Sequence, residues 1–103
     1  MSESKAPTLP MPLFLTGQVV STPGAMELLG RAGVRAIDFV TRHVFADWSE
    51  MDIDDQLRNL LAVRDGLRVF SSYRVGDMSD SPRVWVITEA DRSSTCVLLP
   101  EEY

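Results

Sequence analysis

The spacing of apolar residues changes at Gly66 from a helical period to a strand period, and this change constrains the fold more than any other feature of the sequence. Before Gly66, a helix is predicted to begin at the N-cap Asp52 and to carry four apolar residues on one face. These residues are Ile53, Leu57, Leu60 and Leu61. After Gly66, residues 67–75 alternate between the two faces of a strand. This order of patterns, with helices first and strands afterwards, predicts an α+β domain.

Two shorter helices are expected upstream of this one. Thr22 and Pro23 are typical of a helix start, since threonine accepts a bond from a free backbone amide and proline at the first helical position loses none. This helix should end at Ala32, because Gly33 suits the left-handed residue that terminates a helix. The second helix is expected at about residues 34–45.

The C-terminal third is expected to be extended. Three strands are predicted there, at residues 67–75, 83–89 and 95–99. Residues 13–20 add a short strand, interrupted by Gly17, at an edge of the sheet. We therefore predict an α+β fold of three N-terminal helices packed on a three- to four-stranded antiparallel sheet, most of which is a C-terminal β-meander.

Composition places the chain among ordinary globular proteins of one domain, which we assign to residues 13–103. Residues 1–12 contain three prolines among small and polar residues and are expected to form a flexible leader. Fifteen acidic and ten basic side chains give a net charge of -5, which excludes a generally basic nucleic-acid coat but leaves a local basic patch open. No apolar run approaches the roughly 20 residues that span a bilayer. We therefore expect a cytoplasmic protein without a membrane partner.

His43 is the only histidine and the main candidate for acid–base chemistry. Asp47, four residues on, could orient its imidazole as a general base; alternatively, His43 has a structural role. Neither a second histidine nor a cysteine pair accompanies it, so we expect no metal and no cofactor. The acidic stretch that contains Asp47 and Glu50 also lacks the glycine of a calcium loop. Trp48, in the same stretch, is expected to anchor it to the core.

The densest group of polar side chains comprises Glu89, Asp91, Arg92, Ser93, Ser94 and Thr95. In one interpretation the guanidinium of Arg92 faces solvent and binds a carboxylate or phosphate of a partner. In the other, the loop is a turn that satisfies itself, with Asp91 accepting backbone amides and Glu89 pairing with Arg92. The first interpretation adds Tyr73, Arg74 and Trp85 as neighbours of the binding surface. It also predicts that Arg92→Ala leaves folding nearly unchanged.

Four arginines fall in the β half of the chain, at Arg68, Arg74, Arg83 and Arg92. They could form a basic face that meets an acidic partner or a nucleic-acid backbone. Cys96 lies inside the last predicted strand, where we expect it to be buried as a small hydrophobic residue. A single cysteine excludes an internal disulfide.

Three segments carry a resemblance to a known family. They are GQVVSTPGAMELL at 17–29, RHVFADW at 42–48 and VWVITEADRSSTCVLLPEEY at 84–103. With them the chain resembles a family of small bacterial proteins borne on plasmids and integrative elements, sometimes labelled plasmid-related or restriction–modification associated. The resemblance covers nearly the whole chain after the leader, and implies an accessory protein of mobile DNA. It carries no known active site, so no catalytic residue is transferred from it.

Three functions are compatible with these patterns. The first is a non-enzymatic interaction module that binds a protein partner through residues 89–95 and the adjacent sheet edge, which could also pair with a second copy as a homodimer. The second is a small enzyme or nucleic-acid-processing accessory that uses His43 and Asp47 with Arg92. Convergence of these three side chains in one concave pocket would favour the enzyme. The third is direct contact between DNA and the arginine-bearing sheet.

Overall fold

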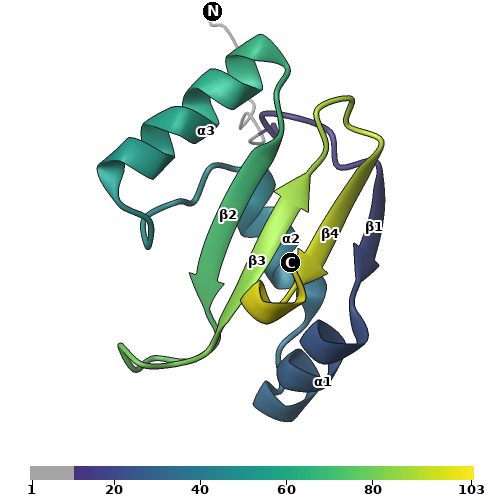
Figure 1. Ribbon diagram of the computed structural model, residues 1–103, viewed down its shortest axis with the longest axis vertical. Coiled ribbons are helices and arrows are strands. Elements are labelled where there is room, and N and C mark those ends of the chain that lie inside the picture. Colours follow the sequence, from purple (N-terminus) through teal and green to yellow (C-terminus); the bar gives the residue numbers. More distant parts are fainter. Residues whose placement is uncertain (1–10) are drawn as a thin grey trace, which may run out of the picture.

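The computed structural model describes residues 11–103, which form one mixed sheet with three α-helices (Figure 1). The elements in chain order are β1 (Gln18–Ser21), α1 (Pro23–Ala32), α2 (Ala36–Val44), α3 (Ile53–Asp65), β2 (Val69–Arg74), β3 (Arg83–Thr88), β4 (Ser94–Leu98) and the 3-10 turn η1 (Pro100–Glu102). The strand order is β1-β4-β3-β2. Of the leader predicted at residues 1–12, all but the last two residues lie outside the described part of the chain.

The prediction of three N-terminal helices on an antiparallel sheet is wrong in two respects. Strand β1 precedes all three helices, and it runs parallel to β4, with Gln18 beside Ser94 and Ser21 beside Val97. The meander β2-β3-β4 is antiparallel, as expected. Strand β1 occupies the side of β4 that β3 leaves open. The long stretch of chain between β1 and β4 permits the parallel direction, because a parallel pair needs a long crossover connection. A short apolar strand pattern carries no information about its direction.

Local capping signals fix the helix boundaries. The Thr22 hydroxyl accepts the Ala25 N–H (3.2 Å), and the Asp52 carboxylate accepts the Asp55 N–H (2.9 Å). Helices α1 and α3 end at Gly33 and Gly66, which adopt left-handed φ angles of 72° and 69°. These four boundaries confirm the sequence prediction.

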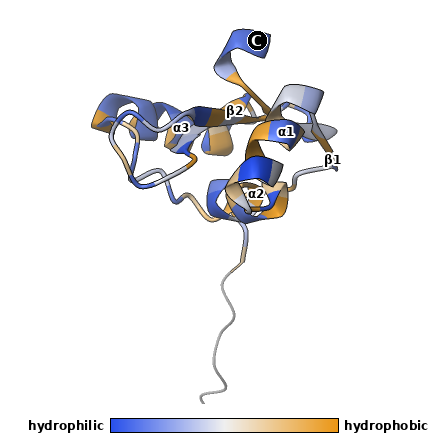
Figure 2. Cartoon of the chain, turned by 90° about the horizontal axis from the view of Figure 1, so that it is seen from below, coloured by the Kyte–Doolittle hydropathy of each residue, from blue (hydrophilic) through white to orange (hydrophobic). Residues whose placement is uncertain are grey.

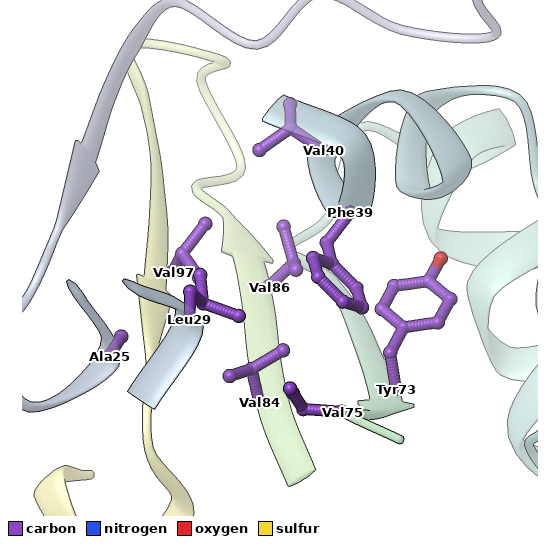
Figure 3. Close-up of a cluster of buried hydrophobic side chains, with 9 residues drawn as sticks. All are labelled: Ala25, Leu29, Phe39, Val40, Tyr73, Val75, Val84, Val86 and Val97. Carbon is purple, nitrogen blue, oxygen red and sulfur yellow. The ribbon is translucent and has the colours of Figure 1, made fainter. Parts of the chain in front are cut away.

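One face of the sheet packs against α1 and α2 and forms the main hydrophobic core (Figure 3). This cluster comprises Ala25, Leu29, Phe39, Val40, Tyr73, Val75, Val84, Val86 and Val97. A second cluster comprises Phe14, Val44, Trp48, Met51, Ala62 and Val69. Trp48 is buried there, which confirms the prediction that it anchors its loop to the core.

The other face of the sheet is covered in part by the C-terminal turn, which lies on the opposite side from α2 (Figure 2). The ring of Trp85 contacts those of Phe70 and Tyr103, with centroid distances of 4.9 and 5.6 Å. Cys96 belongs to this face and is partly exposed, so the prediction of its burial is wrong. Glu102 ties the turn to the start of α1 by accepting bonds from the Thr22 hydroxyl and the Gly24 N–H.

Side chains close the outer edge of β2. The Asn59 amide of α3 donates to the Phe70 carbonyl (2.6 Å) and accepts from the Phe70 N–H (3.1 Å), so it takes the place of a neighbouring strand. Farther along, the Arg74 N–H donates to the Glu50 carboxylate (2.7 Å). Because the N–H and carbonyl of Phe70 and the N–H of Arg74 already have partners, β2 is a poor template for a further strand.

We predict that Asn59→Ala lowers the free energy of unfolding by about 1–3 kcal/mol, because it leaves backbone groups of Phe70 without partners. Urea unfolding followed by circular dichroism measures the change. Arg58→Ala, on the exposed side of the same helix, is the matched control and should change stability by less than about 0.5 kcal/mol. Equal losses in the two variants would contradict the edge role of Asn59.

Candidate functional site

The guanidinium of Arg92 is occupied by backbone carbonyls of its own chain. It donates to the carbonyl oxygens of Leu67 (2.6 Å), Glu89 (3.1 Å) and Ala62 (3.2 Å). Ala62 lies in the last turn of α3, and its carbonyl also accepts the N–H groups of Gly66 and Leu67. Arg92 therefore joins the β3–β4 turn to the C-terminal end of α3.

The rest of the loop also bonds within itself. The Asp91 carboxylate accepts the Ser93 N–H (3.0 Å), and this contact holds the pKa of Asp91 below its usual range. Thr95 is buried, whereas the carboxylate of Glu89 pairs with Arg68 (3.5 Å) and not with Arg92. The arrangement favours the interpretation of residues 89–95 as a turn that satisfies itself. A binding role for this loop stays a prediction.

These contacts reverse our expectation for Arg92→Ala, which the sequence interpretation took to be nearly neutral. We now predict a loss of about 1.5–3 kcal/mol in the free energy of unfolding, because a charged donor leaves three carbonyls. Thermal and urea unfolding measure this loss. Arg92→Lys should recover part of it, and Ala90→Ser, at an exposed position of the same turn, is the control. An Arg92→Ala variant as stable as the parent chain would contradict the structural role.

His43 lies in a buried chain of hydroxyl groups that joins five parts of the fold. Its Nδ1 lies 2.5 Å from the Ser71 hydroxyl on β2, and its Nε2 lies 2.9 Å from the Thr88 hydroxyl on β3. Thr88 in turn contacts Thr95 on β4 (2.6 Å), which donates to the Thr16 carbonyl (2.8 Å). We call this series the His43 relay.

The end of the relay fixes its proton positions. Because the single hydroxyl proton of Thr95 goes to the Thr16 carbonyl, Thr88 must donate to Thr95. His43 then donates from Nε2 to Thr88 and accepts at Nδ1 from Ser71. Both ring nitrogens of a neutral imidazole are thus satisfied. A histidine in this state has no free lone pair for a substrate proton.

The surroundings of His43 hold it in the neutral form. Its side chain is fully buried, and the Phe14 ring makes a T-shaped contact with it at a centroid distance of 5.0 Å. Burial, together with the positive charge of Arg92, lowers the pKa of His43 to about 3. The Arg92 guanidinium lies 5.4 Å from the centroid of the Phe14 ring.

We predict that acidification destabilises the fold through His43 before the carboxylates titrate. The unfolded chain takes up a proton below pH 6.5, whereas the folded chain stays neutral down to about pH 3, so stability is full above pH 6.5 and is lost as the pH falls. At pH 5 the loss is about 2 kcal/mol. Urea unfolding between pH 7 and 5 measures it. His43→Gln, which cannot titrate, should show a flat profile over the same range, and a parallel slope would contradict the assignment.

Asp47 belongs to an ionic cluster separate from His43. Arg42 of α2 binds the carboxylates of Asp47 (2.7 Å) and Glu50 (3.1 Å), and the Arg42 contact lowers the pKa of Asp47. Burial alone would raise the pKa of Glu50, but the N–H of Arg74 and the Arg42 guanidinium outweigh it and lower the pKa. The guanidinium of Arg42 also lies 4.4 Å from the centroid of the Tyr73 ring. The cluster fixes the α2–α3 connection against the sheet.

The structure does not bring His43, Asp47 and Arg92 together in one cavity. Surface hollows of about 480, 310, 430 and 280 Å³ lie elsewhere, and none of them is lined by any of these three residues. The candidate binding residues are also divided, since Tyr73 is buried beneath α2 and Arg74 faces Glu50 (3.6 Å). The three side chains therefore lack the common pocket that the enzyme hypothesis requires.

The arginines of the β half have partners in this chain. Arg68 pairs with Glu89 and donates to the Tyr103 hydroxyl (2.7 Å), and Arg83 donates to the Ser72 hydroxyl (2.7 Å). Arg74 and Arg92 are engaged as described above. A phosphate backbone would have to compete with these contacts, so the sheet offers little support for direct DNA binding.

The sequence interpretation did not identify the surface that α3 exposes. Only Asn59 and Ala62 are buried among the thirteen residues of α3, and both face β2. The four residues predicted as its apolar face are instead exposed, Ile53 at 65%, Leu57 at 50%, Leu60 at 50% and Leu61 at 47%. At roughly 100° per residue they share one side of the helix, opposite Ala62. We call them the leucine face.

Comparison with other proteins adds no assignment. No known protein family, no curated protein and no solved structure matches the chain. The resemblance to proteins of plasmids and integrative elements therefore stays a prediction. Among residues 11–103, no group of three or more histidine, cysteine or acidic side chains is placed to hold a metal ion. No helix in the same range combines the length and apolar character needed to cross a bilayer.

Proposed function

We propose that this chain is a non-catalytic protein-interaction module that binds an amphipathic helix on the leucine face of α3. The observation that carries the proposal is the exposure of all four residues of that face. A surface helix ordinarily turns its apolar stripe to the core, and contiguous exposed apolar side chains mark interaction sites in soluble proteins.

The attachment of α3 supports a docking role. Polar groups hold the helix from behind: Asn59 fastens it to β2, and Arg92 caps its C-terminal end. The helix therefore has a defined position without the burial of its leucines. A preformed, anchored helix loses little conformational entropy when a partner binds, which favours affinity.

A helix is the partner that best fits this surface. The leucine face runs along α3 as a stripe, and amphipathic helices recognise such stripes by anchoring residues three and four positions apart. Accessory roles in plasmid maintenance, transfer or host defence are compatible with such a module. That biological context depends on the family resemblance alone.

We predict that a photo-reactive p-benzoylphenylalanine at Leu57 cross-links to a discrete partner in the organism that encodes the chain. The same group at Met78, which is exposed on the β2–β3 connection, is the control and should give no such product. Mass spectrometry should map the adduct to an amphipathic helix, and Leu61→Glu should abolish it. Absence of an adduct at Leu57, or equal products at both positions, would contradict the proposal.

A further inference from the structure

We infer that the helix bound on the leucine face is α3 of a second copy of this chain, in an antiparallel pair. The inference rests on the proposed function and names its partner. It follows from the residue spacing along α3, from the distribution of charge along it and from its open position in the fold.

The spacing of the exposed residues matches the seam of a two-helix contact. Ile53, Leu57, Leu60 and Arg64 are separated by four, three and four positions, which is the alternation that keeps side chains along a helix–helix interface. Arg64 can cover apolar surface with its aliphatic stem while its guanidinium reaches the rim. Leu61 lies beside the seam and widens it.

The charges of α3 select a second copy in antiparallel orientation. Asp54 and Asp55 occupy the first turn, whereas the last turn holds Arg64 and Asp65. Two parallel copies would place the two acidic first turns side by side, whereas antiparallel copies place the acidic first turn of one beside Arg64 of the other and also oppose the helix dipoles. The charges therefore favour the antiparallel orientation.

A two-fold axis that passes between Leu57 and Leu60 satisfies both the apolar seam and the pairing of opposite charges. In that arrangement Leu57 contacts the partner's Leu60, and Arg64 arrives beside the partner's Asp54. The Arg64 side chain is 70% exposed and, within residues 11–103, pairs with its exposed sequence neighbour Asp65 (2.8 Å), so it can turn to the partner's Asp54 without leaving a buried group unpaired. Such a contact uses the same surface on both copies, so it closes after two chains.

The position of α3 leaves room for this pairing. The helix lies beside the β2 edge and is not covered by α1 or α2 (Figure 1). Four half-exposed apolar side chains per copy cover less surface than a permanent dimer needs, so the contact belongs to the weak, transient class. The chain should therefore exchange between monomer and dimer in a concentration-dependent manner.

Sedimentation equilibrium of the full chain, from about 1 μM to 1 mM, tests the inference. The expected mass rises from 11.5 kDa toward twice that value. Leu57→Glu should raise the dimer dissociation constant roughly 100-fold, and Met78→Glu should leave it unchanged. Circular dichroism confirms that each variant folds. A parent chain that stays monomeric, or a dimer that persists in Leu57→Glu, overturns the inference.

A charge exchange tests the orientation and does not depend on a core substitution. Asp54→Arg should weaken the dimer roughly tenfold, and adding Arg64→Asp should restore it. Within one helix both substitutions oppose the dipole. If they acted only through helix stability, the double variant would be worse than the single one. A double variant that dimerises more weakly than Asp54→Arg therefore overturns the antiparallel pair.

Cross-linking separates failure of this inference from failure of the proposed function. An adduct at Leu57 with twice the mass of the chain supports the second copy as partner. An adduct of a different mass overturns the second copy and leaves the helix-binding function intact. No adduct at all contradicts both.

Discussion

The His43 relay is the interaction on which the rest of the fold depends. It joins α2 to β2, β3 and β4 and reaches the segment before β1, and its histidine contacts Phe14 of the second hydrophobic cluster. Because each buried hydroxyl and both ring nitrogens need a specific partner, the relay fixes how α2 and the strands align more strictly than apolar packing alone would. Both ring nitrogens of His43 are hydrogen-bonded within the protein, so this histidine has a structural role.

Helix α3 is held in a different way from α1 and α2. The first two helices bury apolar side chains against the sheet, whereas α3 is attached through an amide, a guanidinium, the buried Ala62 and the partly buried Val63. Because these contacts fix the position of α3, its exposed leucines are not needed to hold the helix against the sheet. The surface available for a partner is thus a direct result of the contacts made by Asn59 and Arg92.

Local signals in the sequence predicted the elements better than their arrangement. The caps at Thr22 and Asp52, the terminating glycines and the alternation in the meander act over a few residues, so they could be recognised directly. The direction of β1 and the partners of Arg92 depend on contacts far along the chain. Periodicity identified the leucine face as apolar, but it cannot tell whether the same chain or another one covers it.

The pairing of β1 with β4 has a consequence for how this protein is made. Of the strands within residues 11–103, β1 is synthesised first, and its only strand partner there, β4, is synthesised last. Until that partner emerges, Val19 and Val20 have no ladder to join, although α1 and α2 can already form from local contacts. Closure of the sheet is therefore a late event in biogenesis, and contacts of such long sequence separation form slowly.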